Sequence, residues 1–441
     1  MLLFIKKHYL ILSILAVALI LRLVGIFYGY PLALVNDETP TLAASLKMIG
    51  TGSLRANAFQ YYYPAGLAYV CLPFIAVYLA VARFIGIFGS IISELKEAVL
   101  LNLGYFVPAI RIASAVLGAA SVFLVYQLGQ KLFHNKTIGL LAAWFLAINF
   151  FHLANSHYGQ TWTAQTFFIL LVLAWSVYFY QKEKISWRDY FMAGVLIALA
   201  FSINFVGAIS YFWFLLAHWL KHSRPNKFIK TFILNKNFWL TNLVFVLLVA
   251  LVYYLNPFGL NNYFGRILNP DPAAKSYSLL SLASLKILLS YLWHGFIAEP
   301  ILFLLAIPSA VLVWKKNRIA FYFLVPWLII YLLFLAPLTN PMTRYLLPIV
   351  PLLAILIAFL LDYLKQKFSL SVKALVILVV ILSLPSLVFS VLFDARMLKK
   401  DTRAMAYRWV IENIQSGSRI NNLGVGGEMP LVENQEAVKL I

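Results

Sequence analysis

Long apolar runs, separated by short polar and basic connectors, dominate the chain. Runs of about 20 apolar residues recur from the N-terminus to residue 391. A segment in lipid must satisfy its backbone hydrogen bonds internally, which only a helix or a closed barrel does, and these runs lack the alternation of barrel strands. The pattern predicts an all-α polytopic membrane protein with about 11 transmembrane helices. The predicted spans cover residues 9–28, 108–129, 138–154, 162–181, 189–203, 205–220, 238–256, 296–314, 319–336, 345–362 and 373–391.

A further apolar segment, residues 64–89, decides the topology because it is long enough to cross. If it crosses, the basic connectors that follow fall outside the membrane; if it does not, they all fall on the cytoplasmic side. Since basic loops favour the cytoplasm, we expect this segment to be an interfacial or re-entrant helix. The N-terminus is then cytoplasmic and the C-terminus extracytoplasmic. The connectors in question are residues 131–136, 181–188, 221–230, 315–318 and 365–373.

Two outer loops and a polar tail complete the predicted organisation. The transmembrane domain, residues 1–391, contains a first outer loop at 29–107 and a later one at 256–295, whose second half reads as an amphipathic helix. After residue 391 the composition becomes more polar. We expect an amphipathic helix ending near Gly417 and then a short strand, so that residues 392–441 form a short α/β outer segment. About 50 residues build little core, so this segment either leans on the loops or is truncated at Ile441.

Composition agrees with a membrane protein and excludes several functions. The 441 residues are 63% hydrophobic and 11% charged, with a mean hydropathy of +0.87. The net charge is +20, and 18 of the 35 Lys and Arg lie in short segments that we expect to be cytoplasmic. This pattern indicates topology and anionic-lipid contact rather than nucleic-acid binding. The single cysteine, Cys71, excludes a disulfide framework. The first apolar run is too long for a cleaved signal peptide and reads as a signal anchor.

Two adjacent acids, Asp37 and Glu38, follow the first span in the stretch VNDETP. One reading is local: Asn36 or Asp37 caps a helix whose first turn contains Pro40. The other is chemical: a carboxylate on the outer face takes the proton of a hydroxyl nucleophile, while its neighbour holds a metal or orients the acceptor.

Two arginines lie at the predicted outer ends of spans, against the general charge bias. Arg111 opens the span at 108–129, and Arg344 precedes the span at 345–362. Arginines at membrane boundaries often only reach towards the interface. A lipid phosphate at headgroup depth, however, is well bound by a bidentate guanidinium.

Aromatic and histidine side chains near the predicted outer face also allow both a structural and a functional interpretation. The stretch FQYYYPAGLAY, residues 59–69, is either an aromatic belt at the interface or a surface on which a sugar or isoprenoid chain packs. His152 and His157 either pack between helices or contribute chemistry. The candidates for substrate or lipid binding are Tyr61, Tyr62, Tyr63 and His157. No metal-ligand spacing or glycine-rich phosphate loop is present, so a nucleotide-driven engine is unsupported.

The order of motifs resembles the GT-C membrane glycosyltransferases, and more narrowly bacterial relatives of protein O-mannosyltransferases and lipid A aminoarabinose transferases. After the Asp-Glu loop and the proline-containing segment come AIRIASAVLGAASVFLVYQLGQKLF (109–133), GLLAAWFLAINFFHLANSHYGQTWTAQTFFILL (139–171) and TRYLLPIVPLLAIL (343–356). The resemblance covers most of the chain. It implies transfer of a hexose or pentose from a polyprenyl-phosphate donor to a lipid, glycan or protein acceptor on the outer face.

The resemblance also implies roles for individual residues. Asp37 would be the catalytic base, with Glu38 as its partner or as a ligand of a divalent metal. Arg111 would contact the donor phosphate, and Arg344 and Tyr345 would lie near the same phosphate. The chain departs from its relatives in having no acid after Ser156–His157 and Asn204 where many have a lysine. Both departures put metal use and the acceptor class in doubt.

Two other functions compete with the enzyme. A transporter or flippase of polyprenyl lipids or glycolipids would place charged groups near the bilayer midplane, for which Glu299 is the one candidate, and the sequence has no clear inverted repeat. A non-catalytic scaffold that binds a polyprenyl lipid would need the aromatic patch and the arginines but not Asp37.

Overall fold

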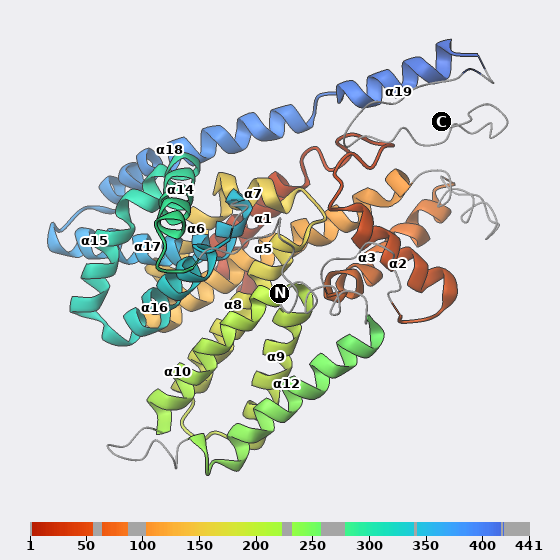
Figure 1. Ribbon diagram of the computed structural model, residues 1–441. Coiled ribbons are helices and arrows are strands. Elements are labelled where there is room, and N and C mark those ends of the chain that lie inside the picture. The colour runs from red at the N-terminus through yellow and green to blue at the C-terminus, as the bar shows by residue number, and fades with distance from the viewer. Residues whose placement is uncertain are drawn as a thin grey trace.

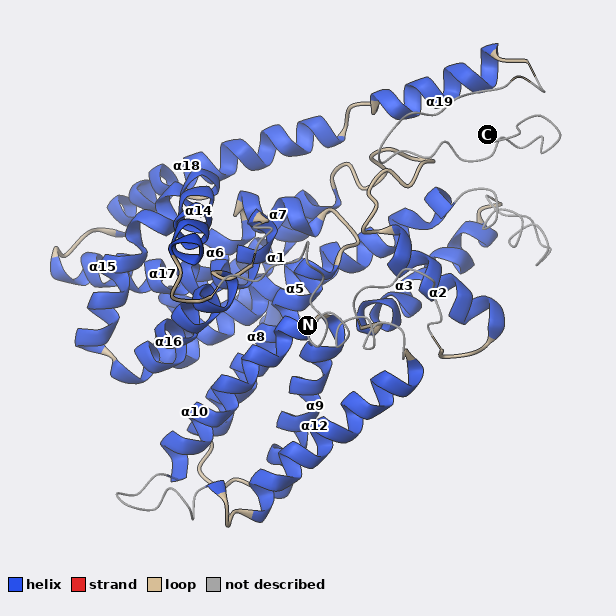
Figure 2. Cartoon of the chain, viewed as in Figure 1, coloured by secondary structure: helices blue, strands red, loops and turns tan. Residues whose placement is uncertain are grey.

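The computed structural model describes residues 2–55, 64–86, 103–222, 232–256, 278–338, 342–415 and 418. Within these residues every regular element is a helix (Figures 1 and 2). The predicted all-α membrane fold is therefore confirmed. In chain order the elements are α1 (Leu2–Leu23), α2 (Thr39–Thr51), α3 (Gly66–Phe84), η1 (Leu103–Phe106), α5 (Val107–Phe133), α6 (Lys136–Ala147), α7 (Phe150–Ser156), α8 (Thr161–Gln181), α9 (Trp187–Ile203), η2 (Phe205–Ser210), α10 (Tyr211–His222), α12 (Lys236–Leu255), α14 (Leu282–Ala298), α15 (Pro300–Lys316), α16 (Arg318–Leu335), η3 (Thr343–Ile349), α17 (Val350–Lys367), α18 (Val372–Met397) and α19 (Thr402–Asn413).

The predicted count of 11 spans is not confirmed, although each predicted span coincides with a helix or a helix pair. Among the described residues, seven helices are long and apolar enough to cross a membrane, or up to nine if each of two bent pairs is one span. Three predicted spans fall short of that length: the apolar part of α1, α9 and α10. Helix α3, which we expected to remain in the outer leaflet, is long and apolar enough to cross a membrane. Its placement at the interface stays a prediction.

Helices α5, α8 and α17 form the buried centre of the bundle, whereas α12 and α18 expose most of their apolar surface. Small residues in α5 let its neighbours approach closely, as in other membrane helices. At Gly118, a Cβ atom would lie 2.5 Å from Ser156 Oγ and 2.9 Å from Arg22 Nε. Helices α1 and α7 therefore pass directly over the α5 backbone at this position.

The span at α6 and α7 bends by 59° at a break that remote side chains stabilise. Arg22, fully buried in the last turn of α1, donates to the carbonyl oxygens of Leu146 and Ala147 at 3.2 and 2.9 Å. It also donates to His152 Nδ1 at 2.9 Å. The bond to Ala147 satisfies a carbonyl at the end of α6, and the bond to Leu146 adds to the backbone bond that its carbonyl accepts from Asn149.

Glu299 stabilises the same break from a second bent pair. It lies between α14 and α15, which meet at 115°. Its Oε1 accepts from the Phe151 backbone N–H at 3.1 Å and from the Ser386 hydroxyl at 3.0 Å. The acid that favoured a transporter is thus engaged as a remote cap for the first turn of α7.

The first outer loop and the start of the tail meet at one end of the bundle. Figure 1 shows α2, α3 and α19 at the same end of the molecule, and Leu32 and Leu34 pack against Ala404 and Tyr407. Helix α19 is the predicted tail helix, and it ends at Asn413 rather than near Gly417. The α/β character of the tail is not confirmed, because the predicted strand and the rest of residues 419–441 lie outside the described residues.

We expect the substitution Arg22→Met to destabilise the bundle. It keeps an unbranched apolar stem but removes the guanidinium that bonds the Ala147 carbonyl oxygen and His152 Nδ1, at a cost of about 3 kcal/mol in the free energy of unfolding. Unfolding in detergent micelles measures the change. The exposed Arg188 provides the control, since Arg188→Met removes the same charge from the surface and should change stability by less than about 0.5 kcal/mol. Equal effects of the two substitutions would contradict the role given to Arg22.

Candidate functional site

A buried ion pair between Glu38 and Arg111 lies at the centre of the candidate site. Arg111 Nε and Nη2 donate to Oε1 and Oε2 of Glu38, each at 2.8 Å, so the contact is bidentate. The side chains are 0% and 1% exposed. The Gly159 backbone N–H adds a third bond, to Oε1, at 2.8 Å. Such a pair is tolerated in a protein interior only because both partners have several further hydrogen bonds.

The sequence reading of VNDETP as a local cap is wrong in detail. Glu38 is the N-cap of α2 and makes no side-chain cap bond, while Asn36 and Asp37 precede the cap. Pro40 lies in the first turn, as predicted. The acids do not cap the helix because their side chains reach across the bundle to two arginines on other helices.

Arg111 also fixes the chain segment that leaves α1. Its Nη1 donates to the carbonyl oxygens of Ile26 and Tyr28, at 3.1 and 2.7 Å. Together with the bonds to Glu38, these contacts use four of the five guanidinium N–H groups. Arg111 therefore holds Glu38 and residues 26–28 in one arrangement.

A second ion pair joins Asp37 to Arg344 beside the first. Arg344 Nη1 lies 2.9 Å from Asp37 Oδ2, and the side chains are 27% and 43% exposed. The Arg344 guanidinium also lies over the Trp162 ring, 5.3 Å from its centroid. Its Nε is buried and has no hydrogen-bond partner among the described residues. This pair is open to solvent where the Glu38 pair is closed.

The two consecutive acids thus bring four chain segments together. The start of α2 supplies Asp37 and Glu38, the first turns of α5 supply Arg111, and η3 supplies Arg344. The start of α8 supplies Trp162, whose ring lies 4.8 Å from that of Tyr345. The Tyr345 carbonyl oxygen accepts from the Tyr331 hydroxyl at 2.9 Å.

His157 is buried and contacts Asp394, near the end of α18. Its Nε2 lies 3.1 Å from Asp394 Oδ1, and its ring meets Phe393 edge to face at 5.1 Å. Gly159, whose amide holds Glu38, follows two residues later. His157 therefore anchors the turn behind Glu38, and its predicted contact with substrate or lipid stays a prediction.

Sequence reasoning missed two members of this arrangement. The Gly159 amide has no sequence signal, because every residue except proline carries a backbone N–H. Asp394 could have been found, since an acid next to the last apolar span calls for a partner. Three predicted residues of the aromatic patch, Tyr61, Tyr62 and Tyr63, lie outside the described residues.

The residues present do not fit a metal at Glu38. Both of its oxygens already accept bonds from Arg111, and a guanidinium at 2.8 Å would repel a divalent cation. In the part of the chain that the structure describes, no group of three or more His, Cys, Asp or Glu side chains could hold an ion.

Comparisons with known proteins agree with this architecture. Residues 99–254 match the family model described as Dolichyl-phosphate-mannose-protein mannosyltransferase. This match covers α5 to α12 and includes Arg111, His157 and Gly159. A comparison with curated proteins finds no match.

Solved structures share the fold over most of the chain. ArnT from Cupriavidus metallidurans bound to undecaprenyl phosphate is 16% identical, with a TM-score of 0.58, covering 96% of this chain and 84% of that one. In its apo state ArnT is 18% identical, with a TM-score of 0.52, covering 81% of this chain and 60% of that one. The oligosaccharyltransferase of Archaeoglobus fulgidus, in complex with Zn and sulfate, is 15% identical, with a TM-score of 0.59 and coverage of 92% and 56%.

These neighbours are mostly longer than this chain, which spans 60% of the apo ArnT chain. The chain is a multi-pass membrane protein with the fold of the GT-C glycosyltransferases, and the family resemblance drawn from its sequence is confirmed.

Proposed function

We propose that this protein is a glycosyltransferase that moves a hexose or pentose from a polyprenyl-phosphate donor to a hydroxyl acceptor on the outer face of the membrane. The observation that carries the proposal is the pairing of Asp37 with Arg344 at 2.9 Å, with both side chains partly exposed. A carboxylate and a guanidinium side by side at the end of a membrane bundle supply the two groups that the reaction needs.

The reaction assigns one task to each group. The acceptor hydroxyl attacks the anomeric carbon, and Asp37 takes its proton, so that a glycosidic bond forms. The bond between the anomeric carbon and the phosphate oxygen breaks, and its electron pair leaves with the polyprenyl phosphate. Arg344 stabilises the charge on this leaving phosphate through its guanidinium.

Glu38 and Arg111 act through position rather than contact in this proposal. The described contacts of Arg111 use four of its N–H groups within the protein, which leaves little capacity to bind a phosphate. The pair fixes the backbone at residue 38 and so the direction of the neighbouring Asp37. Arg344, with its unpartnered Nε among the described residues, is the better candidate for the donor phosphate, with Tyr345 beside it.

The nature of the donor and the side of the membrane rest on separate arguments. ArnT is named as bound to undecaprenyl phosphate, and this chain shares its fold, which supports a polyprenyl-phosphate donor here. The excess of Lys and Arg in alternate connectors supports a cytoplasmic N-terminus, an extracytoplasmic site and an extracytoplasmic tail.

Asp37→Asn should abolish sugar transfer without unfolding the protein. Loss of the base should lower the rate at least about 100-fold, because the amide cannot accept the hydroxyl proton. Transfer from a polyprenyl-phosphate sugar in proteoliposomes measures the effect. The exposed acid Glu183 provides the control, since Glu183→Gln should leave transfer unchanged. Normal transfer by the Asp37 variant would sink the assignment of the base.

The neighbouring substitution, Glu38→Gln, should act on stability. It leaves the buried Arg111 charge without its partner, and we expect the free energy of unfolding to fall by about 3 kcal/mol. Asp37→Asn should lower it by less than about 1 kcal/mol, because that pair is partly exposed. Thermal unfolding of the two variants side by side tests this division, and a larger loss of stability for Asp37→Asn would reverse it.

Substitution of Arg344 should weaken productive use of the donor. Arg344→Gln removes the charge that faces the phosphate, and we expect kcat/KM for the lipid donor to fall about 100-fold, with a smaller loss for Arg344→Lys. Arg318 is a matched control because its guanidinium also lies over a tryptophan ring, that of Trp314, at 4.9 Å. If Arg318→Gln lowers kcat/KM as much, the effect is not specific to the donor site.

A further inference from the structure

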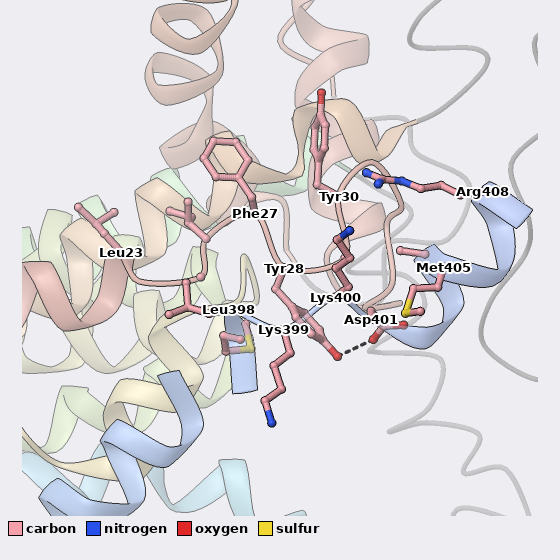
Figure 3. Close-up of a pocket in the computed structure, with 15 residues that line it drawn as sticks. Leu23, Phe27, Tyr28, Tyr30, Leu398, Lys399, Lys400, Asp401, Met405 and Arg408 are labelled. Atoms are coloured by element: carbon pink, nitrogen blue, oxygen red, sulfur yellow. Dashed lines mark hydrogen bonds between the residues drawn. The ribbon is translucent and has the colours of Figure 1, made fainter. Parts of the chain in front are cut away.

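A cavity of about 340 Å³ lies beside the candidate site, between the segment that leaves α1 and the junction of α18 and α19. Its walls come from residues 23–30 and 397–408 (Figure 3). The two segments touch closely at Gly25, whose φ is +68° and where a Cβ would lie 2.4 Å from Met397 Cβ. Only glycine combines this backbone conformation with this approach.

Basic side chains line the cavity. Lys399, Lys400 and Arg408 belong to its lining and are exposed, and within the described residues none of them forms an ion pair. In Figure 3, Lys400 and Arg408 point towards the space beside Tyr30, while Lys399 points away. Two cations therefore converge on one space.

The one carboxylate in the lining, Asp401, is already engaged. It accepts bonds from the Tyr28 hydroxyl and from Arg403 Nε and Nη2 (Figure 3 shows the Tyr28 bond). The hydrogen bonds from Arg403 hold the pKa of Asp401 at about 2, so that it stays ionised and paired. The lining cations therefore attract an anion that the described part of the chain does not itself supply.

The rest of the cavity wall is apolar and open. Phe27, Leu398 and Met405 belong to the lining and are 60%, 69% and 54% exposed. The cavity lies where α1 and α18, two apolar helices, both end. A ligand that suits it carries a negative headgroup and an apolar body, and sits at the depth of the membrane surface.

We propose that this cavity binds the headgroup phosphate of an anionic phospholipid of the bilayer. Lys400 and Arg408 bind the phosphate, Tyr30 lies beside it, and Phe27, Leu398 and Met405 contact the first methylenes of the acyl chains. A small soluble anion would leave the exposed apolar wall in water. The site is separate from the proposed donor site, which is lined by Asp37 and Arg344.

A lipid bound in the cavity would also restrain the ion pair of Arg111 and Glu38, because Tyr28 contacts both the cavity wall and Arg111. The hydroxyl of Tyr28 bonds Asp401 at the start of α19, and its carbonyl oxygen accepts from Arg111 at 2.7 Å. A lipid that holds residues 27–30 against 398–408 therefore also holds the segment to which Arg111 is bonded.

Native mass spectrometry of the full chain in detergent, titrated with phosphatidylglycerol and with phosphatidylcholine, tests the proposal. We expect tighter retention of phosphatidylglycerol. The double substitution K400Q/R408Q should weaken it about 30-fold, since each basic residue near a membrane surface contributes a factor of about five. Met405→Trp, which narrows the cavity without a change of charge, should weaken it about tenfold. The control K184Q/R188Q removes two exposed charges from the connector between α8 and α9 and should have less than a twofold effect.

Lipid retention is measured without sugar transfer, so this experiment tests the lipid site independently of the proposed activity. Equal losses in K400Q/R408Q and in the control, or no effect of Met405→Trp, would show diffuse attraction instead of a cavity and would overturn the proposal. Parallel titrations with undecaprenyl phosphate and inorganic phosphate separate the sources of phosphate. If K400Q/R408Q weakens the binding of undecaprenyl phosphate or inorganic phosphate and leaves that of phosphatidylglycerol unchanged, the assignment to a bilayer phospholipid is wrong.

Discussion

The rest of the site depends on two opposite charges, Glu38 and Arg111, buried where water cannot solvate them. Neither is stable there alone, because an isolated buried charge costs several kcal/mol, so each requires the other and a full set of hydrogen bonds. Those bonds come from distant parts of the chain: the segment after α1, the start of α2, the start of α5 and the turn before α8. The charge pair is therefore the point at which these segments are fixed relative to one another.

The neighbouring pair, Asp37 and Arg344, is partly exposed where Glu38 and Arg111 are buried, and the different roles proposed for the two acids follow from this contrast. Asp37 and Arg344 are partly exposed and held by one contact, so they can exchange it for contacts with a substrate at modest cost. Asp37 and Glu38 are consecutive, so a carboxylate that is fully buried adjoins one that is partly exposed. The helix that follows, α2, fixes the directions of both.

The sequence predicts much of this fold, because apolar length and basic connectors are strong signals in lipid. It also singles out Asp37, Glu38, Arg111 and Arg344, since charges at the ends of apolar spans are costly and so stand out. It does not predict which acid pairs with which arginine, because that depends on how helices far apart in sequence pack. The sequence does not predict the role of the Gly159 amide for a related reason: a backbone donor acquires a role only through its surroundings. The count of spans depends on helices such as α9 and α10, whose apolar lengths are marginal.

The bond from Tyr28 to Asp401 joins residues 373 positions apart, and this separation has a consequence for biosynthesis. A chain that enters the membrane from its N-terminus presents the segment after α1 early, and that segment waits through the synthesis of nearly every later helix for its partner. Arg344 reaches Asp37 almost as late. A growing chain therefore carries the acids of its site long before it carries the groups that complete it, so the site closes only when the final helices arrive.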